Sequence, residues 1–155
     1  MPDTGVILTV EVCLDLSARN KQDLIDRLAK QAGNSLSVSP EVILRQLDAL
    51  EKLGSTALGS GIAIPHAQVT GLQRPFVALV RLAHSIDFQA HDEQPVDLVF
   101  VVLWPDGETK NLLATMAHLC SLVRAPDVAR RIRRSPTPQA AVAILNGWRA
   151  PNSTP

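Results

Sequence analysis

Histidine and cysteine side chains are the first candidates for chemistry in this chain, and their spacing limits what they can do. The four histidines are His66, His84, His91 and His118. A zinc site needs His or Cys ligands at short spacing, such as HxxxH or CxxC, and the sequence has neither. We therefore expect no metal site. The cysteines, Cys13 and Cys120, lie inside apolar stretches, which predicts reduced core residues of a cytoplasmic protein.

His66 differs from the other histidines in its setting. It follows a short apolar run and Pro65, next to a segment rich in glycine and hydroxyl residues. An imidazole near neutral pH is a nucleophile that can carry a covalent group. A phosphoryl group on the ring would need hydrogen-bond donors, and such a segment supplies N–H and O–H groups. On these features alone a structural loop histidine remains the default interpretation, and a functional histidine is the alternative.

The glycine-rich segment runs from Gly54 to Gly61 and contains Ser55 and Thr56. Its glycines lack Cβ bulk and would let an anion or another backbone come close. The two hydroxyl residues either donate hydrogen bonds to a phosphoryl group or cap the loop. The segment is neither a Walker loop nor a GxGxxG dinucleotide site, so we expect no cofactor. A Ser-His-Asp hydrolase is a further alternative, but the sequence has no GxSxG motif.

Length and charge exclude several classes of protein. The chain has 155 residues, with 15 Lys and Arg against 15 Asp and Glu. This length fits one domain with a core that needs no disulfide or metal. Zero formal charge argues against a nucleic-acid binder, which relies on clustered basic residues. The longest uninterrupted apolar run, residues 98–104, is too short for direct membrane insertion, and the N-terminus has no basic signal-peptide region.

Two predicted helices precede the glycine-rich segment. Asn20 followed by Asp23 is typical of a helix N-cap with a capping-box partner, and Gly33 is expected to end that helix. The run Ser39-Pro40-Glu41 predicts the start of a second helix, because it combines a hydroxyl cap, a proline at N1 and an acid in the first turn. Gly54 closes this helix as a C-cap.

Apolar runs predict the strands. Residues 76–82 and 96–103 are nearly continuous in apolar character, which suits strands covered on both faces. Residues 62–64 predict a short buried strand that stops at Pro65, and residues 86–88 a short extra strand. Helices on either side of these strands indicate an α/β or α+β domain.

The C-terminal third is predicted to be helical over residues 111–123, 127–134 and 138–145. Residues 147–155 contain Pro, Asn and Ser and predict a flexible tail. Four arginines share one arc of the second of these helices: Arg130, Arg131, Arg133 and Arg134. We expect this arc to be a solvated face; contact with an acidic partner is the alternative.

Two stretches resemble a known family. The run from Glu51 to Ala67, EKLGSTALGSGIAIPHA, closely resembles the active-site signature of phosphotransferase-system (PTS) enzyme IIA of the fructose/mannitol/nitrogen-regulatory (PtsN-like) class. Residues 86–100, IDFQAHDEQPVDLVF, look like the second long match of that family. The likeness covers residues 8–146, which we take as the domain. It implies an α/β fold with a small mixed sheet flanked by helices on both sides.

The resemblance implies a phosphoryl carrier. In that family an HPr-type phosphocarrier protein, or its nitrogen-branch counterpart, donates a phosphoryl group to a histidine of IIA. His66 matches that position and would attack through Nε2, in an in-line transfer between nitrogen atoms. Transport members pass the group to a IIB protein. Nitrogen-branch members control partner proteins through their phosphorylation state.

The chain departs from the family pattern at two places. Many members carry Arg where this chain has Leu50, and Lys52 is the nearest substitute for that charge. Many also carry a second histidine at the start of the helix after the VDLVF strand. The corresponding stretch here is Thr109-Lys110-Asn111-Leu112, so Asn111 is the candidate donor from that place.

Three functions are compatible with these features. A stand-alone IIA favours the nitrogen-regulatory branch over sugar transport. A degenerate IIA-like binding module that no longer takes phosphate is suggested by Leu50 and the missing second histidine. The transport version would be a phosphotransferase component and the regulatory version a binding switch. Neither would be a stand-alone metabolic enzyme.

Overall fold

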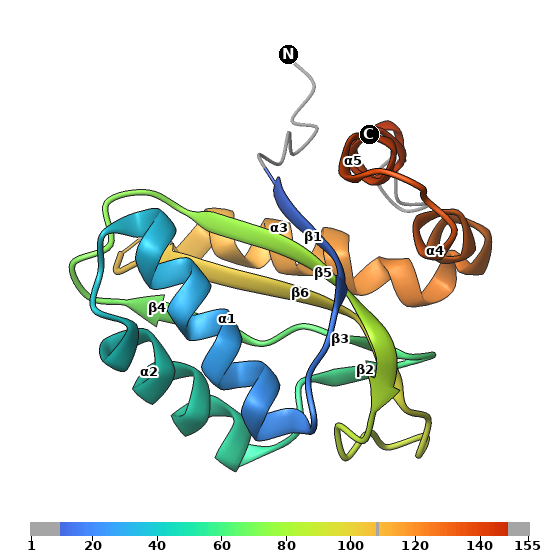
Figure 1. The fold of residues 1–155 in the computed structure, drawn as a ribbon. Helices are drawn as coiled ribbons and strands as arrows, with labels where there is room; N and C mark the ends of the chain where they lie inside the picture. Colours follow the sequence, from blue (N-terminus) through green and yellow to red (C-terminus); the bar gives the residue numbers. More distant parts are fainter. Residues whose placement is uncertain (1–9, 108, 149–155) are drawn as a thin grey trace.

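A mixed sheet of six strands runs through the computed structural model, which describes residues 10–107 and 109–148 (Figure 1). The strand order is β1-β5-β6-β3-β2, and β4 also pairs with β6. β5 and β6 are antiparallel, whereas β1 is parallel to β5, and both β3 and β4 are parallel to β6. The strands are β1 (Val10–Leu16), β2 (Ala57–Gly59), β3 (Ile62–Ala63), β4 (His66–Val69), β5 (Phe76–Ile86) and β6 (Val96–Pro105). The predicted mixed sheet is confirmed.

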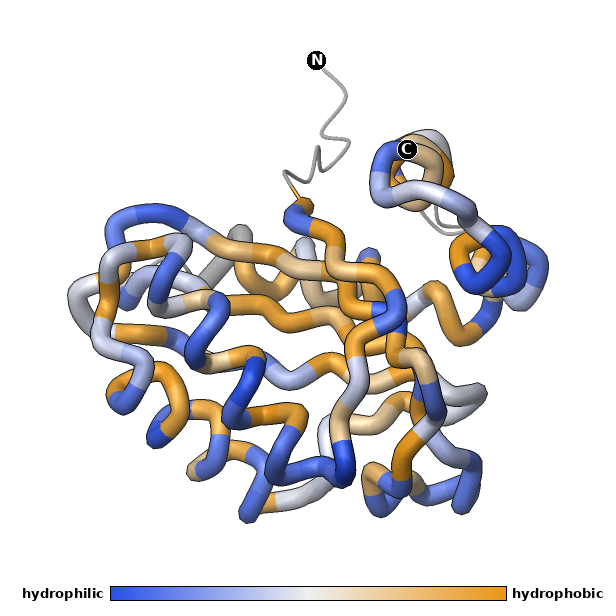
Figure 2. The backbone as a smooth tube through the Cα atoms, in the orientation of Figure 1, coloured by the Kyte–Doolittle hydropathy of each residue, from blue (hydrophilic) through white to orange (hydrophobic). Residues whose placement is uncertain are grey.

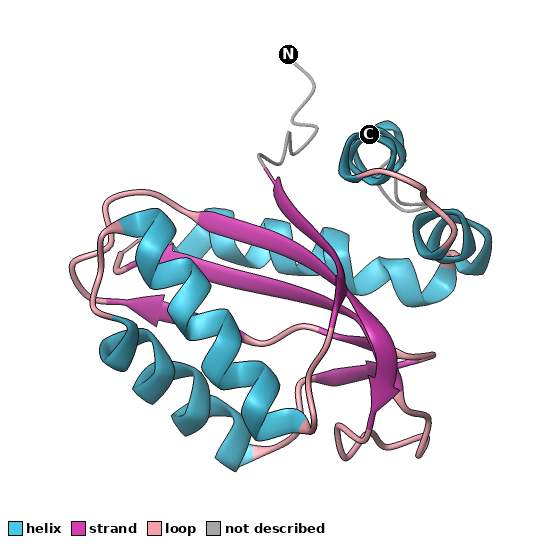
Figure 3. Ribbon diagram, in the orientation of Figure 1, coloured by secondary structure: helices cyan, strands magenta, loops and turns pink. Residues whose placement is uncertain are grey.

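Helices cover both faces of this sheet, as predicted (Figures 1 and 3). α1 and α2 pack on one face, where Leu24 and Leu47 enter a shared core with the strands. The C-terminal helices pack on the other face, where Leu119 and Leu145 enter a second core. The helices are α1 (Lys21–Leu36), α2 (Pro40–Leu53), α3 (Thr109–Cys120), the 3₁₀ helix η1 (Ser121–Arg124), α4 (Pro126–Arg133) and α5 (Pro138–Gly147).

The two long strands supply both cores because their side chains alternate between the faces. Val80 of β5 pairs with Val99 of β6, and both lie in the core under α1 and α2. The neighbouring pair, Leu79 and Phe100, lies in the other core. Figure 2 shows the result as strands that are apolar along most of their length. The prediction of strands covered on both faces is confirmed.

Some strands differ from the prediction. β1 and β4 were not predicted, because Glu11 and Asp15 interrupt the apolar positions of β1, and β4 is only HAQV. Each pairs with a long parallel strand, β1 with β5 and β4 with β6. The separate strand expected at residues 86–88 is wrong, since Ile86 is the last residue of β5.

The C-terminal third is helical as predicted, with shifted boundaries. The helix expected over residues 111–123 is α3 followed by η1. The first two residues of the expected tail belong to the folded part of the chain, because Gly147 ends α5 and Trp148 is buried. The Trp148 ring lies against His118 of α3, with ring centroids 4.6 Å apart. Residues 149–155 of the expected tail lie outside the described residues.

Gly33 does not end α1, contrary to the sequence prediction. The helix continues to Leu36 and is closed by Ser37, which has a left-handed φ of 56°. Gly33 instead admits the connection to α2. A Cβ at this position would lie 2.7 Å from Pro40 Cγ and 2.8 Å from the carbonyl oxygen of Val38.

Gly33→Ala is therefore expected to destabilise the protein, although alanine is the better helix former. The expected loss in the free energy of unfolding is about 1–3 kcal/mol, the usual cost of overpacking. Gly147→Ala in α5 is the matched control, because nothing lies within 4 Å of its Cβ position. Urea unfolding of both variants measures the difference. Equal stabilities would contradict the close packing at Gly33.

Candidate functional site

His66 is the first residue of β4, and its side chain is half-buried. It lies opposite Val102 of β6, whose amide donates a 3.0 Å hydrogen bond to the carbonyl of Pro65. The prediction of a strand that stops at Pro65 is wrong in its boundaries. β3 ends at Ala63, and His66 opens the next strand. The parallel neighbour β6 thus fixes the backbone on which the imidazole stands.

One ring nitrogen of His66 is held by the backbone. Nδ1 lies 2.7 Å from the carbonyl oxygen of Ile64. Because a carbonyl oxygen can only accept, the hydrogen of this bond belongs to Nδ1. In the neutral ring, Nε2 then has the free lone pair. The geometry makes Nε2 the nucleophilic atom of the side chain.

The two hydroxyl residues of the glycine-rich loop bond to groups of the protein itself. Ser55 Oγ donates to the carbonyl of Phe88 at 2.6 Å and accepts from the amide of Ala57 at 3.1 Å. Thr56 donates to the carboxylate of Glu51 through its hydroxyl and through its amide, the latter at 3.3 Å. In this structure both hydroxyls serve the shape of the loop.

Glu51, near the end of α2, is ion-paired with Lys21 of α1, with 2.7 Å between Nζ and Oε2. The side chain of Lys21 is 16 % exposed to solvent, and that of Glu51 is 5 % exposed. The Lys21 ammonium also lies over the ring of Phe88, 4.6 Å from its centroid. Sequence reasoning missed Lys21 and Phe88, because no local pattern shows that they meet Glu51.

Within the described residues, no hydrogen bond or ion pair joins the side chain of Lys52, Ser55 or Thr56 directly to His66. Lys52 lies in the last turn of α2, where its exposed side chain makes no hydrogen bond or ion pair with a described residue. Leu50 is half-buried on the same helix. Asn111 belongs to the first turn of α3, and its side chain lies outside what the structure describes. Thr56 is linked to His66 indirectly, through hydrogen bonds to Ile64. The carbonyl of Thr56 accepts from the amide of Ile64 at 3.0 Å, and the carbonyl of Ile64 bonds to the His66 ring.

The turn before β3 is also bound by side chains of this chain. The amide of Ser60 donates to Asp92 at 2.8 Å, and its carbonyl accepts from Arg133 at 2.8 Å. Arg133 is paired with Asp97 at 2.9 Å, so it is an exception to the predicted solvated arginine face. The amides of Ser60 and Gln94 hold the pKa of Asp92 below its ordinary value, because they bond to the charged carboxylate.

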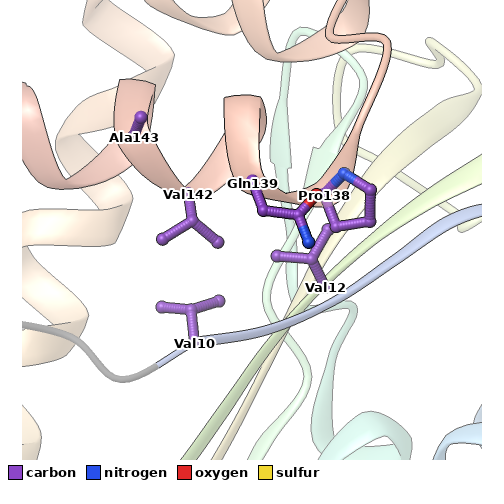
Figure 4. A pocket seen from close by; sticks show the side chains of 6 residues that line it. All are labelled: Val10, Val12, Pro138, Gln139, Val142 and Ala143. Carbon is purple, nitrogen blue, oxygen red and sulfur yellow. The ribbon is translucent and has the colours of Figure 1, made fainter.

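An apolar groove of about 400 Å³ lies between β1 and α5 (Figure 4). It is far from His66 in the sheet, because β5 and β6 separate β1 from β4. None of its lining side chains is titratable, so it offers no chemistry of its own. They are Val10 and Val12 of β1 and Pro138, Gln139, Val142 and Ala143 of α5.

In residues 10–107 and 109–148, no group of three or more His, Cys, Asp and Glu side chains could hold a metal ion. No helix within those ranges combines the length and the apolar character needed to cross a membrane. His66 and the loop before it are therefore the strongest candidate site within these ranges.

Comparison with known proteins identifies similar sequences and folds. Residues 7–148 match the family described as "Phosphoenolpyruvate-dependent sugar phosphotransferase system, EIIA 2". The nitrogen regulatory protein of Bradyrhizobium diazoefficiens is 34 % identical over 145 residues, 94 % of this chain and 95 % of that protein. The crystal structure of nitrogen regulatory protein IIA-Ntr from Neisseria meningitidis has a TM-score of 0.84 and 29 % identity, over 87 % of this chain and 92 % of that one. Escherichia coli enzyme IIAMTL, solved with phosphorylated IIBMTL, shares the fold with a TM-score of 0.69 and 21 % identity, over 94 % and 99 %.

Proposed function

This chain belongs to the EIIA 2 family of the phosphoenolpyruvate-dependent phosphotransferase system, and on that premise we propose that it carries a phosphoryl group on Nε2 of His66. The observation that carries the proposal is the bond from Nδ1 to the carbonyl of Ile64, which leaves the Nε2 lone pair free. The donor is an HPr-type phosphocarrier protein with a phosphohistidine of its own.

The transfer exchanges one phosphorus–nitrogen bond for another. The Nε2 lone pair of His66 attacks phosphorus as the bond to the donor nitrogen breaks, and that electron pair returns to the donor ring. Apart from His66, the protein takes no covalent part in this transfer. Positioning of the reacting groups and stabilisation of the phosphoryl charge therefore dominate the catalysis. We assign the charge stabilisation to Lys52 and Asn111. Ser55 and Thr56 act by shaping the loop, since their hydroxyls already donate to the carbonyl of Phe88 and to the carboxylate of Glu51.

We propose that the chain is a nitrogen-regulatory IIA, whose phosphorylation state is read by a regulatory target protein. The likeness to the Bradyrhizobium nitrogen regulatory protein supports this choice, because it extends over nearly the whole of both chains. The alternative is a sugar-transport IIA that passes its phosphoryl group to a IIB protein. This alternative is supported by E. coli IIAMTL, which shares the fold of this chain and was solved in complex with phosphorylated IIBMTL.

We assign the phosphoryl transfer to the cytoplasm. Cys13 and Cys120 are free thiols, which fits a reducing compartment. Burial raises the pKa of both thiols, so they stay protonated and unreactive at neutral pH.

The test is a phosphorylation assay on the wild-type chain. We expect incubation with phosphoenolpyruvate, enzyme I and an HPr-type carrier to add one phosphoryl group, seen by intact mass. The label should be lost in acid and survive base, as a phosphohistidine does. An unlabelled chain beside a working donor would leave only the degenerate binding module. Transfer of the label onward to a IIB protein would replace the regulatory assignment with sugar transport.

A further inference from the structure

We propose that the buried Lys21–Glu51 ion pair positions the catalytic ring, and that it acts on His66 through Thr56 and Ile64. The predicted effect on the rate of phosphoryl transfer rests on the proposed function. The predicted effect on the tautomer of the His66 ring does not, because the nitrogen that carries the hydrogen can be identified in the unphosphorylated protein.

The ion pair joins the two helices on one face of the sheet. α1 and α2 lie side by side (Figure 1), and the pair connects the first turn of α1 to the last turn of α2. With 5 % of its side chain exposed, the Glu51 carboxylate depends on the Lys21 charge, since an unpaired buried charge is strongly destabilising. Lys21 is held in turn by the face of Phe88.

Both oxygens of the Glu51 carboxylate bind the next segment of the chain. Oε2 accepts from the amide of Thr56 as well as from Lys21, and Oε1 accepts from the Thr56 hydroxyl. Ser55 is anchored to the carbonyl of Phe88 at the same place. The start of the glycine-rich loop is thus fixed by a charged group, and bonds to charged groups are stronger than neutral ones.

Two further bonds lead from Thr56 to the imidazole. The carbonyl of Thr56 accepts from the amide of Ile64 at 3.0 Å. The carbonyl of Ile64 then accepts from Nδ1 of His66 at 2.7 Å. The position of the Ile64 carbonyl decides which ring nitrogen carries the hydrogen. If that carbonyl moves, the ring can place its hydrogen on Nε2, and the nucleophilic lone pair is lost.

The test needs a folded protein in which Thr56 has lost its anchor. The double variant Lys21→Met/Glu51→Met provides this, because apolar residues of similar volume often replace a buried ion pair without loss of stability. Thr56→Val is the second variant, and it weakens the anchor by removing the hydroxyl bond to Glu51 while the amide bond remains. Thr56→Ser is its matched control and keeps both bonds to Glu51.

Nitrogen-15 NMR of the His66 ring, recorded at about pH 8.5 where an ordinary histidine is neutral, is the first measurement. We expect hydrogen on Nδ1 in the wild type and in Thr56→Ser, and a mixture of both tautomers in the double variant and in Thr56→Val. Phosphoryl uptake from the carrier is the second measurement. It should fall roughly tenfold or more in the double variant and by a smaller factor in Thr56→Val, as expected when a reacting group is misplaced.

An unchanged ring spectrum in both the folded double variant and Thr56→Val would overturn the proposal. If the double variant does not fold, the comparison of Thr56→Val with Thr56→Ser decides alone. A wild type that takes no phosphoryl group would refute the proposed function and still leave the ring spectra to decide the role of the ion pair. A merely structural role for Lys21 and Glu51 would change stability but not the tautomer of His66.

Discussion

His66→Ala is expected to abolish uptake of the phosphoryl group and to leave the fold intact. The substitution removes Nε2, the atom with the free lone pair, and no other residue of the loop offers an imidazole. The cost in stability is about 1 kcal/mol, because one hydrogen bond to the Ile64 carbonyl is lost from a half-buried site. Intact mass after incubation with the donor chain measures the uptake, and circular dichroism checks the fold.

His84→Ala and His91→Ala are the controls for this result. Both side chains are exposed, and both variants should be labelled like the wild type. A label that persists in His66→Ala would show that another residue accepts the group. Base treatment would then separate the cases, since a phosphoserine on Ser55 is cleaved by base and a phosphohistidine is not.

The helices could be predicted because their signals are local. Asn20 caps α1 by accepting from the amide of Asp23 at 2.8 Å, as the capping pattern predicted. Pro40 opens α2, and Gly54 follows its last residue. Gly33 misled the prediction, because its missing Cβ serves the contact with Pro40 and not the end of a helix. Sequence alone does not distinguish these two uses of glycine.

The strands that depend on a neighbour could not be predicted. β6 has a continuous apolar run that identifies it without any partner. β4 has no such signal: His66 and Gln68 are polar, and only the register with β6 makes the segment a strand. The same strand carries the candidate catalytic residue, so its backbone geometry had to come from the structure.

The candidate site shows the same division between local and tertiary information. His66 and the glycine-rich loop were found from the sequence and from the family resemblance. The direction of the Ser55 and Thr56 hydroxyls was not, because it is set by Phe88 and Glu51. Glu51 in turn needs Lys21, which lies on another helix. Tertiary contacts decide whether a hydroxyl serves a ligand or its own loop.

Gly61→Ala is expected to cause a large loss of stability. Gly61 has a left-handed φ of +79°, which costs an L-residue energy in any surroundings. A Cβ would also lie 2.7 Å from Nη2 of Arg133 and 3.1 Å from Oδ1 of Asp97. The guanidinium would have to shift, which weakens its bonds to Asp97 and to the carbonyl of Ser60. We expect a loss of about 2–4 kcal/mol in the free energy of unfolding, measured in urea.

Gly71→Ala separates backbone strain from the loss of the arginine. Gly71 has a similar φ of +89°, but nothing lies within 4 Å of its Cβ position. Its replacement should cost only the strain, about 1–2 kcal/mol. Equal losses at the two positions would contradict a role for the Arg133 contact.

A double-mutant cycle between Gly61→Ala and Arg133→Ala isolates that contact. Once Arg133 is gone, the new methyl group no longer meets the guanidinium, so Gly61→Ala should cost less than in the wild type. It should still cost more than Gly71→Ala, because Oδ1 of Asp97 remains 3.1 Å from the Cβ position. The side chains of Arg133 and Asp97 are 31 % and 34 % exposed, and solvent screening keeps the value of their pair modest. A coupling energy near zero would mean that Arg133 can move aside freely. A clear coupling would mean that the guanidinium resists displacement, because its bonds to Asp97 and to the carbonyl of Ser60 hold it between α4 and the turn before β3.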